Sequence, residues 1–229
     1  MKVCEIFKSI EGEGMRTGLV AVFVRLHGCN LRCSYCDSMY AVTGDDYRQM
    51  SCDEILEAVR SFGVKAVTLT GGEPLLHAGV GELLHSLSEG GFLVNVETNG
   101  TVPCKWRYPG LFYTMDWKCK SSGMSDKMQI ETVAMLGAHD VLKFVVGSAD
   151  DLRETAEVVD ALSRIKAQGV NADGSACGMP HVFVSPVFGK LAYQEIVAWM
   201  LSESAMVQNN ARFQVQLHKV VWDPDLRGV

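Results

Sequence analysis

Short apolar runs alternate along the chain with segments whose apolar residues recur every three or four positions. The short runs predict buried strands, and the longer periodic segments predict amphipathic helices. Strands that alternate with helices imply right-handed βαβ units and a mostly parallel sheet. The predicted strands are Leu19–Leu26, Val64–Thr70, Phe92–Glu97, Leu111–Trp117, Asp140–Val146, His181–Ser185 and Arg212–His218.

Several of the predicted helices have recognisable ends. Ser51 and Glu54 form a capping box before a run with its apolar residues on one face, and Gly63 can end that helix. Asp150 or Asp151 can cap a later helix that turns its apolar residues toward the sheet. The other predicted helices are Leu75–Ser88 and Leu191–Leu201.

Polar residues gather directly after nearly every predicted strand. Parallel barrels collect their active-site residues at the carboxyl ends of many strands, whereas an open doubly wound sheet concentrates them at one switch point. The distribution favours a partial (β/α)6-type barrel of about six strands, with some helices reduced. Nothing in the composition marks a second core, so residues 1–229 are predicted to form one domain.

Composition excludes several classes of protein. The net charge of −6 argues against a partner with a phosphate backbone, and hence against nucleic acid. No apolar run approaches the roughly 18 residues that a membrane span needs. Residues Met1–Gly12 lack the apolar core of a signal peptide. The sequence therefore predicts a cytoplasmic protein that does not enter a membrane.

Eight cysteines in a cytoplasmic chain do not indicate a disulfide framework. Three of them, Cys29, Cys33 and Cys36, fall on one short segment after a predicted strand, with the spacing C-x3-C-x2-C. Three thiolates on one loop can hold an iron–sulfur cluster and leave one iron without a protein ligand. A structural zinc site is the alternative, but it requires a fourth ligand from a distant cysteine or from His27.

The other five cysteines are scattered singly. They are Cys4, Cys52, Cys104, Cys119 and Cys177. Cys104, Cys119 and Cys177 could converge on a second cluster, but the favoured interpretation is that they are buried thiols.

A second motif, Gly71-Gly72-Glu73-Pro74, follows the predicted strand Val64–Thr70. Its glycines let backbone groups approach a ligand closely, and Glu73 offers an acceptor for an ammonium group. A strand that simply ends in a Gly-Gly turn would look the same. Glu97-Thr-Asn-Gly100 is also open to two interpretations, a ligand-binding strand exit or an ordinary turn.

Together, the cysteine loop and the Gly-Gly-Glu-Pro segment resemble the radical S-adenosylmethionine (SAM) superfamily. The resemblance implies a [4Fe–4S] cluster on Cys29, Cys33 and Cys36, whose open iron is chelated by SAM. In that superfamily, reductive cleavage of SAM yields a deoxyadenosyl radical that abstracts a hydrogen atom from the substrate. The cofactors supply this chemistry and the protein supplies geometry and exclusion of water.

The chain resembles more closely the 7-carboxy-7-deazaguanine synthase family of queuosine and deazapurine biosynthesis. The segments that carry the resemblance are Phe7–Gly14, Phe23–Arg25, Cys36–Ser38, Asp116–Cys119, Ser121–Gly123 and Gln216–Lys219. It implies a lyase that converts 6-carboxy-5,6,7,8-tetrahydropterin to 7-carboxy-7-deazaguanine with loss of ammonia, uses SAM catalytically and requires Mg²⁺. It also implies a homodimer and a one-electron reductant of the flavodoxin or ferredoxin type.

The same resemblance assigns residues to SAM, substrate and metal. The SAM-binding residues are Tyr35, Asp37, Gly71, Gly72, Glu73, Glu97, Asn99, Asp116, Trp117 and Lys118. The substrate-binding residues are Ile10, Glu11, Gly12, Glu13, Arg25, Thr70 and His218. Ser38 matches a hydroxyl ligand of Mg²⁺, a hard ion that takes few protein oxygens and retains waters. No residue is assigned as a general acid or base.

Some of these residues have a structural alternative. Arg25 is the one charge in an apolar run and is interpreted as a clamp on the substrate carboxylate, but it could pair with a structural carboxylate instead. His218 is as consistent with a structural histidine as with a substrate contact. Glu11 and Ser38 stand where the family often has Gln and Thr, so the pterin contact of Glu11 is expected to differ. A glycyl-radical activase with the same cofactors is the nearest alternative function, and a zinc-binding module is the alternative of another class.

Overall fold

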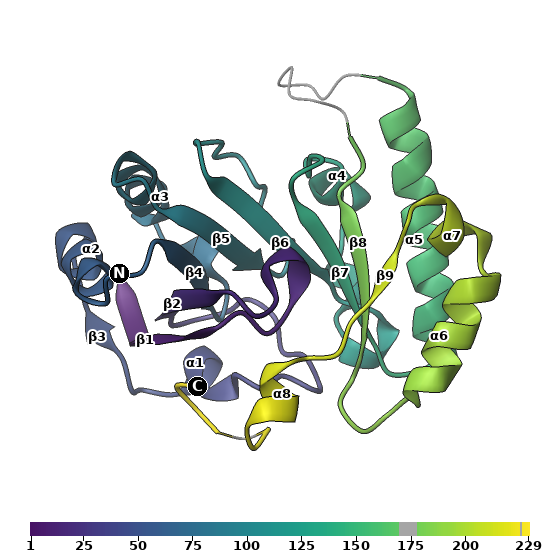
Figure 1. Ribbon diagram of the computed structural model, residues 1–229, viewed down its shortest axis with the longest axis horizontal. Coiled ribbons are helices and arrows are strands. Elements are labelled where there is room, and N and C mark those ends of the chain that lie inside the picture. Colours follow the sequence, from purple (N-terminus) through teal and green to yellow (C-terminus); the bar gives the residue numbers. More distant parts are fainter. Residues whose placement is uncertain (170–177, 225) are drawn as a thin grey trace.

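The computed structural model describes residues 1–169, 178–224 and 226–229. The strands within these residues form one nine-stranded sheet (Figure 1). The strand order is β3-β1-β2-β4-β5-β6-β7-β8-β9. The strands are β1 Lys2–Ile10, β2 Val20–Leu26, β3 Arg48–Gln49, β4 Ala66–Gly71, β5 Leu93–Thr98, β6 Leu111–Trp117, β7 Val141–Val146, β8 His181–Pro186 and β9 Arg212–Phe213. The helices are α1 Met39–Thr43, α2 Cys52–Ser61, α3 Val80–Glu89, α4 Ile130–Val133, α5 Ala149–Ala167, α6 Tyr193–Ser202, α7 Ser204–Gln208 and α8 His218–Val221.

The sheet is parallel from β2 to β9 and does not close on itself. This confirms the predicted partial barrel, whose six main strands are β2 and β4 to β8. Helices α2 and α3 lie outside one half of the sheet and α5, α6 and α7 outside the other (Figure 1). Within the described residues, only a loop joins β5 to β6 and only short turns and α4 join β6 to β7, so the helices are reduced as predicted.

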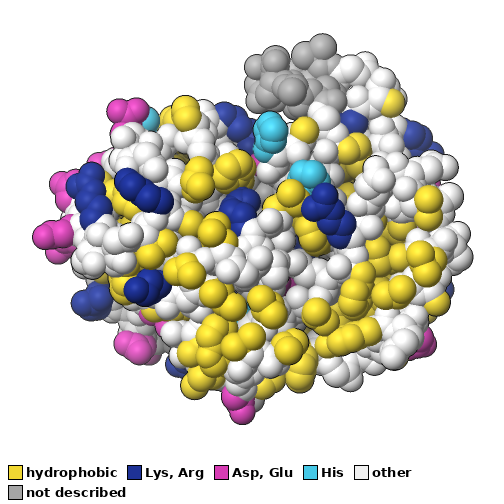
Figure 2. Space-filling view, viewed as in Figure 1, with side chains coloured by type: hydrophobic (Ala, Val, Ile, Leu, Met, Phe, Trp, Pro, Cys, Tyr) yellow, Lys and Arg dark blue, Asp and Glu magenta, His cyan; other side chains and the backbone are white. Residues whose placement is uncertain are grey.

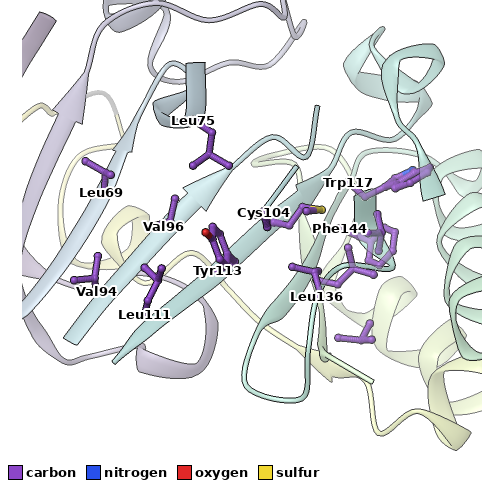
Figure 3. Packing of buried hydrophobic residues seen from close by; sticks show 14 of the residues in the cluster. Leu69, Leu75, Val94, Val96, Cys104, Leu111, Tyr113, Trp117, Leu136 and Phe144 are labelled. Atoms are coloured by element: carbon purple, nitrogen blue, oxygen red, sulfur yellow. The ribbon is translucent and has the colours of Figure 1, made fainter. Parts of the chain in front are cut away.

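Each parallel strand points alternate side chains to opposite faces of the sheet, as strand geometry requires. One face packs on the helices and contributes the apolar core. Figure 3 shows part of this core, including Leu69, Val96, Tyr113 and Phe144 from four successive strands. The other face is concave and polar. It carries side chains such as Thr70, Glu97, Asp116, Lys143 and Ser185.

Helix ends are close to their predicted positions, with one correction. The capping box at Ser51 is present, and Gly63 follows the end of α2 with a left-handed φ of 66°. Helix α5 is capped by Ser148 and not by Asp150 or Asp151, because the Ser148 side chain accepts from the backbone N–H of Asp151. Those two aspartates lie in the first turn instead, where negative charge is favourable.

Two predictions at the chain ends were wrong. The sequence analysis missed β1, which pairs antiparallel with β2, because its mixture of charged and half-buried residues is not a clean strand pattern. The last strand, β9, is two residues long, and His218 is the first residue of α8 and not a strand exit.

Cys104 and Cys119 are buried in the apolar core, as predicted, and Cys177 lies outside the described residues. Among the helices of the described segments, none is both long and apolar enough to cross a bilayer.

Candidate functional site

A cavity of about 740 Å³ opens at the carboxyl ends of the parallel strands. Its wall combines the cysteine loop after β2, the exits of β4, β5 and β6, the loop after β1, and the C-terminal segment around α8. All the residues assigned to cluster, SAM, substrate and metal line this cavity except Glu73 and Trp117. The structure therefore brings together motifs that are more than 200 residues apart in the sequence.

The three cysteines of the loop after β2 all contribute to the cavity wall. The loop is fixed from behind by the segment after β6. The backbone N–H of Ser34 donates to the Ser122 carbonyl at 2.9 Å, and the Ser34 hydroxyl donates to the Ser121 carbonyl. The side-chain amide of Asn99 donates to the Cys29 Sγ at 3.5 Å. Such contacts hold the thiols in place and leave them open on the cavity side.

Gly71 and Gly72 are required by a close approach of two backbones. Gly71 has φ of 146°, and a Cβ there would lie 2.1 Å from the Leu26 carbonyl oxygen. A Cβ on Gly72 would lie 2.2 Å from the Gly28 carbonyl oxygen and 2.9 Å from the Cys29 Cβ. The glycines therefore let the exit of β4 pack directly against the cysteine loop, which brings the backbone of the Gly-Gly-Glu-Pro motif beside the three cysteines.

Glu73 has a different role from the predicted ammonium acceptor. Its side chain is fully buried, and its oxygens accept from the backbone N–H groups of Leu75 and Asn99 and from the Thr98 hydroxyl. Burial raises the pKa of Glu73 to about 7 despite these hydrogen bonds. Glu73 thus ties the exit of β4 to the exit of β5, and does not line the cavity.

Trp117 also points away from the cavity, into the packed layer that Figure 3 shows around Phe144. Its indole N–H donates to a Glu154 carboxylate oxygen at 3.0 Å. Because Asp116 faces the cavity, strand alternation directs Trp117 to the helix side. The Trp117 side chain therefore lies outside the cavity, so that only its backbone is left for the contact with SAM that the resemblance implies.

The loop Ile10–Glu13 begins at the last residue of β1, and two of its residues are held in buried positions. Glu11 is 2% exposed and accepts a hydrogen bond from the Thr68 hydroxyl of β4. Glu13 accepts from the Lys143 ammonium through Oε2 at 2.7 Å, while its Oε1 is buried and has no partner among the described residues. A Cβ on Gly12 would lie 2.2 Å from Nδ1 of His218, so glycine allows the loop to meet α8.

The buried carboxyl of Glu11 leads to a prediction about pH. Burial and the neighbouring Glu97 raise the pKa of Glu11 to about 7. A carboxyl whose folded-state pKa is raised holds its proton more tightly when folded, so stability falls as pH rises from about 4.5 to about 7. Glu11→Gln cannot ionise. As pH rises from about 5.5 to 8, the free energy of unfolding of Glu11→Gln should therefore increase by about 2 kcal/mol relative to that of the wild type.

Urea unfolding of both proteins across this pH range measures the difference. The exposed Glu89, at the end of α3, provides the matched control, and Glu89→Gln is expected to follow the wild type at every pH. A constant offset between Glu11→Gln and the wild type would show that Glu11 does not change ionisation in this window.

Arg25 and Ser38 lie together on the wall near α1. The Arg25 Nε donates to a carboxylate oxygen of Glu5 at 2.7 Å, and the same oxygen accepts from the Tyr40 hydroxyl. The Ser38 hydroxyl lies 3.4 Å from the Arg25 Nη1 and donates to Asp37 at 3.1 Å. Arg25 thus pairs with a structural carboxylate, which is the alternative that the sequence left open. It also lines the cavity.

Two lysines that the sequence analysis did not single out complete the electrostatics of the site. Lys143 of β7 is 4% exposed and lies between Glu13 and Asp116. Lys219 of α8 pairs with Asp37 at 3.2 Å and so connects the C-terminal segment to the cysteine loop. Lys143 could have been found by the signal that marked Arg25, a single charge in an apolar strand.

The arrangement fits an iron–sulfur cluster with SAM beside it. Three sulfur atoms share one wall, a two-glycine backbone approaches one of their residues, and the unpartnered Glu13 Oε1 offers a buried acceptor to a ligand. His27, the nearby candidate for a fourth zinc ligand, contacts the Gly44 carbonyl and packs against Tyr47.

Comparison with known proteins agrees with this geometry. Residues 23–107 match the model of the radical SAM superfamily. The chain is 39% identical to 7-carboxy-7-deazaguanine synthase of Clostridium acetobutylicum, covering 100% of this chain and 99% of that protein. It is 38% identical to the protein of the same name from Methanospirillum hungatei, covering 98% of this chain and 86% of the relative.

Solved structures give the same picture of the fold. The crystal structure of QueE from Escherichia coli superposes with a TM-score of 0.70 and covers 95% of this chain and 94% of that one, at 21% identity. These comparisons do not favour a glycyl-radical activase or a zinc-binding module. The chain belongs to the 7-carboxy-7-deazaguanine synthase family of radical SAM enzymes.

Proposed function

We propose that this chain converts 6-carboxy-5,6,7,8-tetrahydropterin to 7-carboxy-7-deazaguanine with loss of ammonia, and that residues 1–229 act as one radical SAM domain. The observation that carries the proposal is one cavity lined by the three cysteines, the Gly71-Gly72 turn and the loop Ile10–Glu13. These three elements of the cavity offer places for the cluster, for SAM and for a small polar substrate.

The cysteine loop is the proposed site of the [4Fe–4S] cluster, with Cys29, Cys33 and Cys36 as ligands. When bound, cluster and SAM supply one-electron chemistry that removes a hydrogen atom from the substrate. The backbone around Gly71 and Gly72 is positioned to bind the methionine part of SAM. The remaining proposed SAM contacts are Tyr35, Asp37, Glu97, Asn99, Asp116 and Lys118, all of which line the cavity.

The pterin is proposed to bind against the opposite part of the wall. The buried carboxylates of Glu11 and Glu13 can accept its N–H groups, and the free Glu13 Oε1 suits that role. Thr70 donates to Glu97 at 2.9 Å and faces the same space. Arg25 and His218 are proposed contacts for the carboxylate and the ring, and burial lowers the pKa of His218, which favours a neutral imidazole.

Ser38 is the proposed protein ligand of Mg²⁺. Its hydroxyl lies beside an Asp37 oxygen at 3.1 Å, so two oxygens of the kind that a hard cation prefers are already adjacent. Arg25 lies on the other side of the hydroxyl and would be available to the substrate carboxylate. The expected role of the metal is to steer that carboxylate.

The homodimer is also a proposal. Figure 2 shows hydrophobic side chains gathered on the lower part of one face, where Figure 1 places α6 and α8. Large exposed apolar side chains on these two helices include Leu201 of α6 and Val220 and Val221 of α8. The flavodoxin- or ferredoxin-type reductant and the cytoplasmic location remain predictions from the sequence.

The test is anaerobic reconstitution followed by incubation with SAM, Mg²⁺, a reductant and 6-carboxytetrahydropterin, with detection by mass spectrometry. We expect 7-carboxy-7-deazaguanine to form in excess of the SAM consumed. Omission of Mg²⁺ is the control for the metal and should slow product formation. Cleavage of SAM without this product would refute the pterin substrate and direct the search to an activase.

A further inference from the structure

Lys143 is a charged residue in the middle of an apolar strand, in the sequence Val141-Leu-Lys-Phe-Val-Val146. It is buried, with a side chain 6% exposed, and its ammonium faces the cavity. Surface lysines normally extend their ammonium into water, and a buried one persists only where charged or polar groups of the protein replace that water. The question is what this ammonium does in the site.

Its partners come from two different parts of the proposed active site. Nζ lies 2.7 Å from Glu13 Oε2, on the loop proposed to bind the pterin, and 3.1 Å from Asp116 Oδ1, on the strand proposed to bind SAM. Asp116 also pairs with Lys118 at 3.1 Å. The lysine therefore connects two segments that are far apart in the sequence. One is the loop proposed to bind the substrate, and the other is the end of β6 proposed to bind SAM.

Lys143 offsets the charges of three carboxylates in the site. Glu13, Glu97 and Asp116 all face Lys143 from three elements, and like charges at such range repel strongly away from water. Lys118, directly after β6, and His218 on α8 are further charged or titratable groups that face these side chains. Glu11 and Arg16 are the next charged groups that act on Glu97. Burial raises the pKa of Glu97, and Lys143 gives the largest opposing effect.

We propose that Lys143 is a positioning residue for the pterin: its ammonium fixes the Glu13 carboxylate, so that the unpartnered Glu13 Oε1 points into the cavity as an acceptor for substrate N–H groups. This inference rests on the proposed function. Lys143 does not itself touch the substrate in this scheme. It acts through Glu13 on the substrate and through Asp116 on the strand that carries SAM.

The test is binding of 6-carboxypterin, an air-stable aromatic analogue, to the cluster-loaded protein with SAM, measured by pterin fluorescence across pH. Lys143→Met should raise the dissociation constant at least tenfold. It should also shift the acidic limb of the binding curve to higher pH, because Lys143 lowers the pKa of Asp116 and opposes the rise in the pKa of Glu97, and both carboxyls lose this effect. Lys143→Arg keeps the charge and should recover most of the affinity and the wild-type limb.

Lys166 is the matched control. It is another buried lysine, and its ammonium donates to the backbone carbonyls of Ala134 and Leu136, away from the cavity. Lys166→Met should lower stability without moving either the affinity or its pH dependence.

Three outcomes would contradict the inference, and only the last of them also contradicts the proposed function. If the wild type binds 6-carboxypterin and Lys143→Met binds it equally well at all pH values, the role of Lys143 is refuted and the proposed function stands. If Lys166→Met shifts the binding curve as much as Lys143→Met, the effect is only structural and the inference is also refuted. If the wild type cleaves SAM but does not bind the pterin, the proposed function fails and the inference fails with it.

Discussion

Replacement of Cys33 by alanine should abolish both the iron–sulfur cluster and turnover. Cys33 is the central member of three thiols on one loop, and removing it leaves two, which cannot hold a four-iron cluster that depends on three protein ligands. After anaerobic reconstitution the wild type should be brown and contain about four irons per chain. Cys33→Ala should be nearly colourless and form no 5′-deoxyadenosine from SAM.

Cys52→Ala provides the matched control. Cys52 starts α2, its thiol contacts the Gly79 carbonyl at 3.7 Å, and it does not line the cavity. This variant should keep its iron and its turnover. Full activity in Cys33→Ala would refute the cluster assignment, and one zinc per chain in the wild type would favour the zinc-binding alternative.

Gly72→Ala should lose most SAM binding even though it changes no side chain that could contact SAM. The new methyl group would lie 2.2 Å from the Gly28 carbonyl oxygen and 2.9 Å from the Cys29 Cβ. Backbone cannot rotate away as a flexible side chain can, so the cysteine loop and the exit of β4 must separate. Overpacking of this kind costs about 1–3 kcal/mol or more, which corresponds to roughly 10- to 100-fold in SAM affinity.

Equilibrium SAM binding and iron content should be measured together on Gly72→Ala. Gly79→Ala is the control, since a Cβ there meets nothing closer than 3.7 Å. The control should bind SAM as the wild type does. If Gly72→Ala bound SAM normally with full iron content, the close packing of these two backbones would not be needed for the site.

The parallel strands were predictable because their pattern is local. Runs such as Leu111–Trp117 are mostly apolar, and the structure confirms this run as β6 with the same bounds. Strand β1 is different, since it is antiparallel and has only one buried residue, Val3. A strand of this kind is stabilised by its neighbour β2, and pairing with a neighbour is information that a single segment does not contain.

The motifs of the site were also predictable, but the directions of several side chains were not. The positions of Glu73 and Trp117 beside the motifs suggested SAM contacts. Their side chains instead hold the strand exit and pack in the core, because a buried carboxylate takes nearby N–H donors and because strand alternation decides the face. Lys143 stands out in the sequence as a single charge in an apolar strand, but its partners, Glu13 and Asp116, are brought to it only by the tertiary fold.

One hydrogen-bonded pair described by the structure has a consequence for how the protein is made. The Gly14 backbone N–H donates to the Gln214 side chain at 2.7 Å, across 200 residues of sequence, and α8 follows directly after Gln214. Synthesis of 200 residues takes about 10–40 s at ordinary translation rates. Throughout that interval the wall contributed by α8 is missing, and the thiols of the cysteine loop are open to oxidants and stray metals. Iron loading that needs this wall should therefore follow synthesis of α8, and until then the thiols depend on a reducing environment.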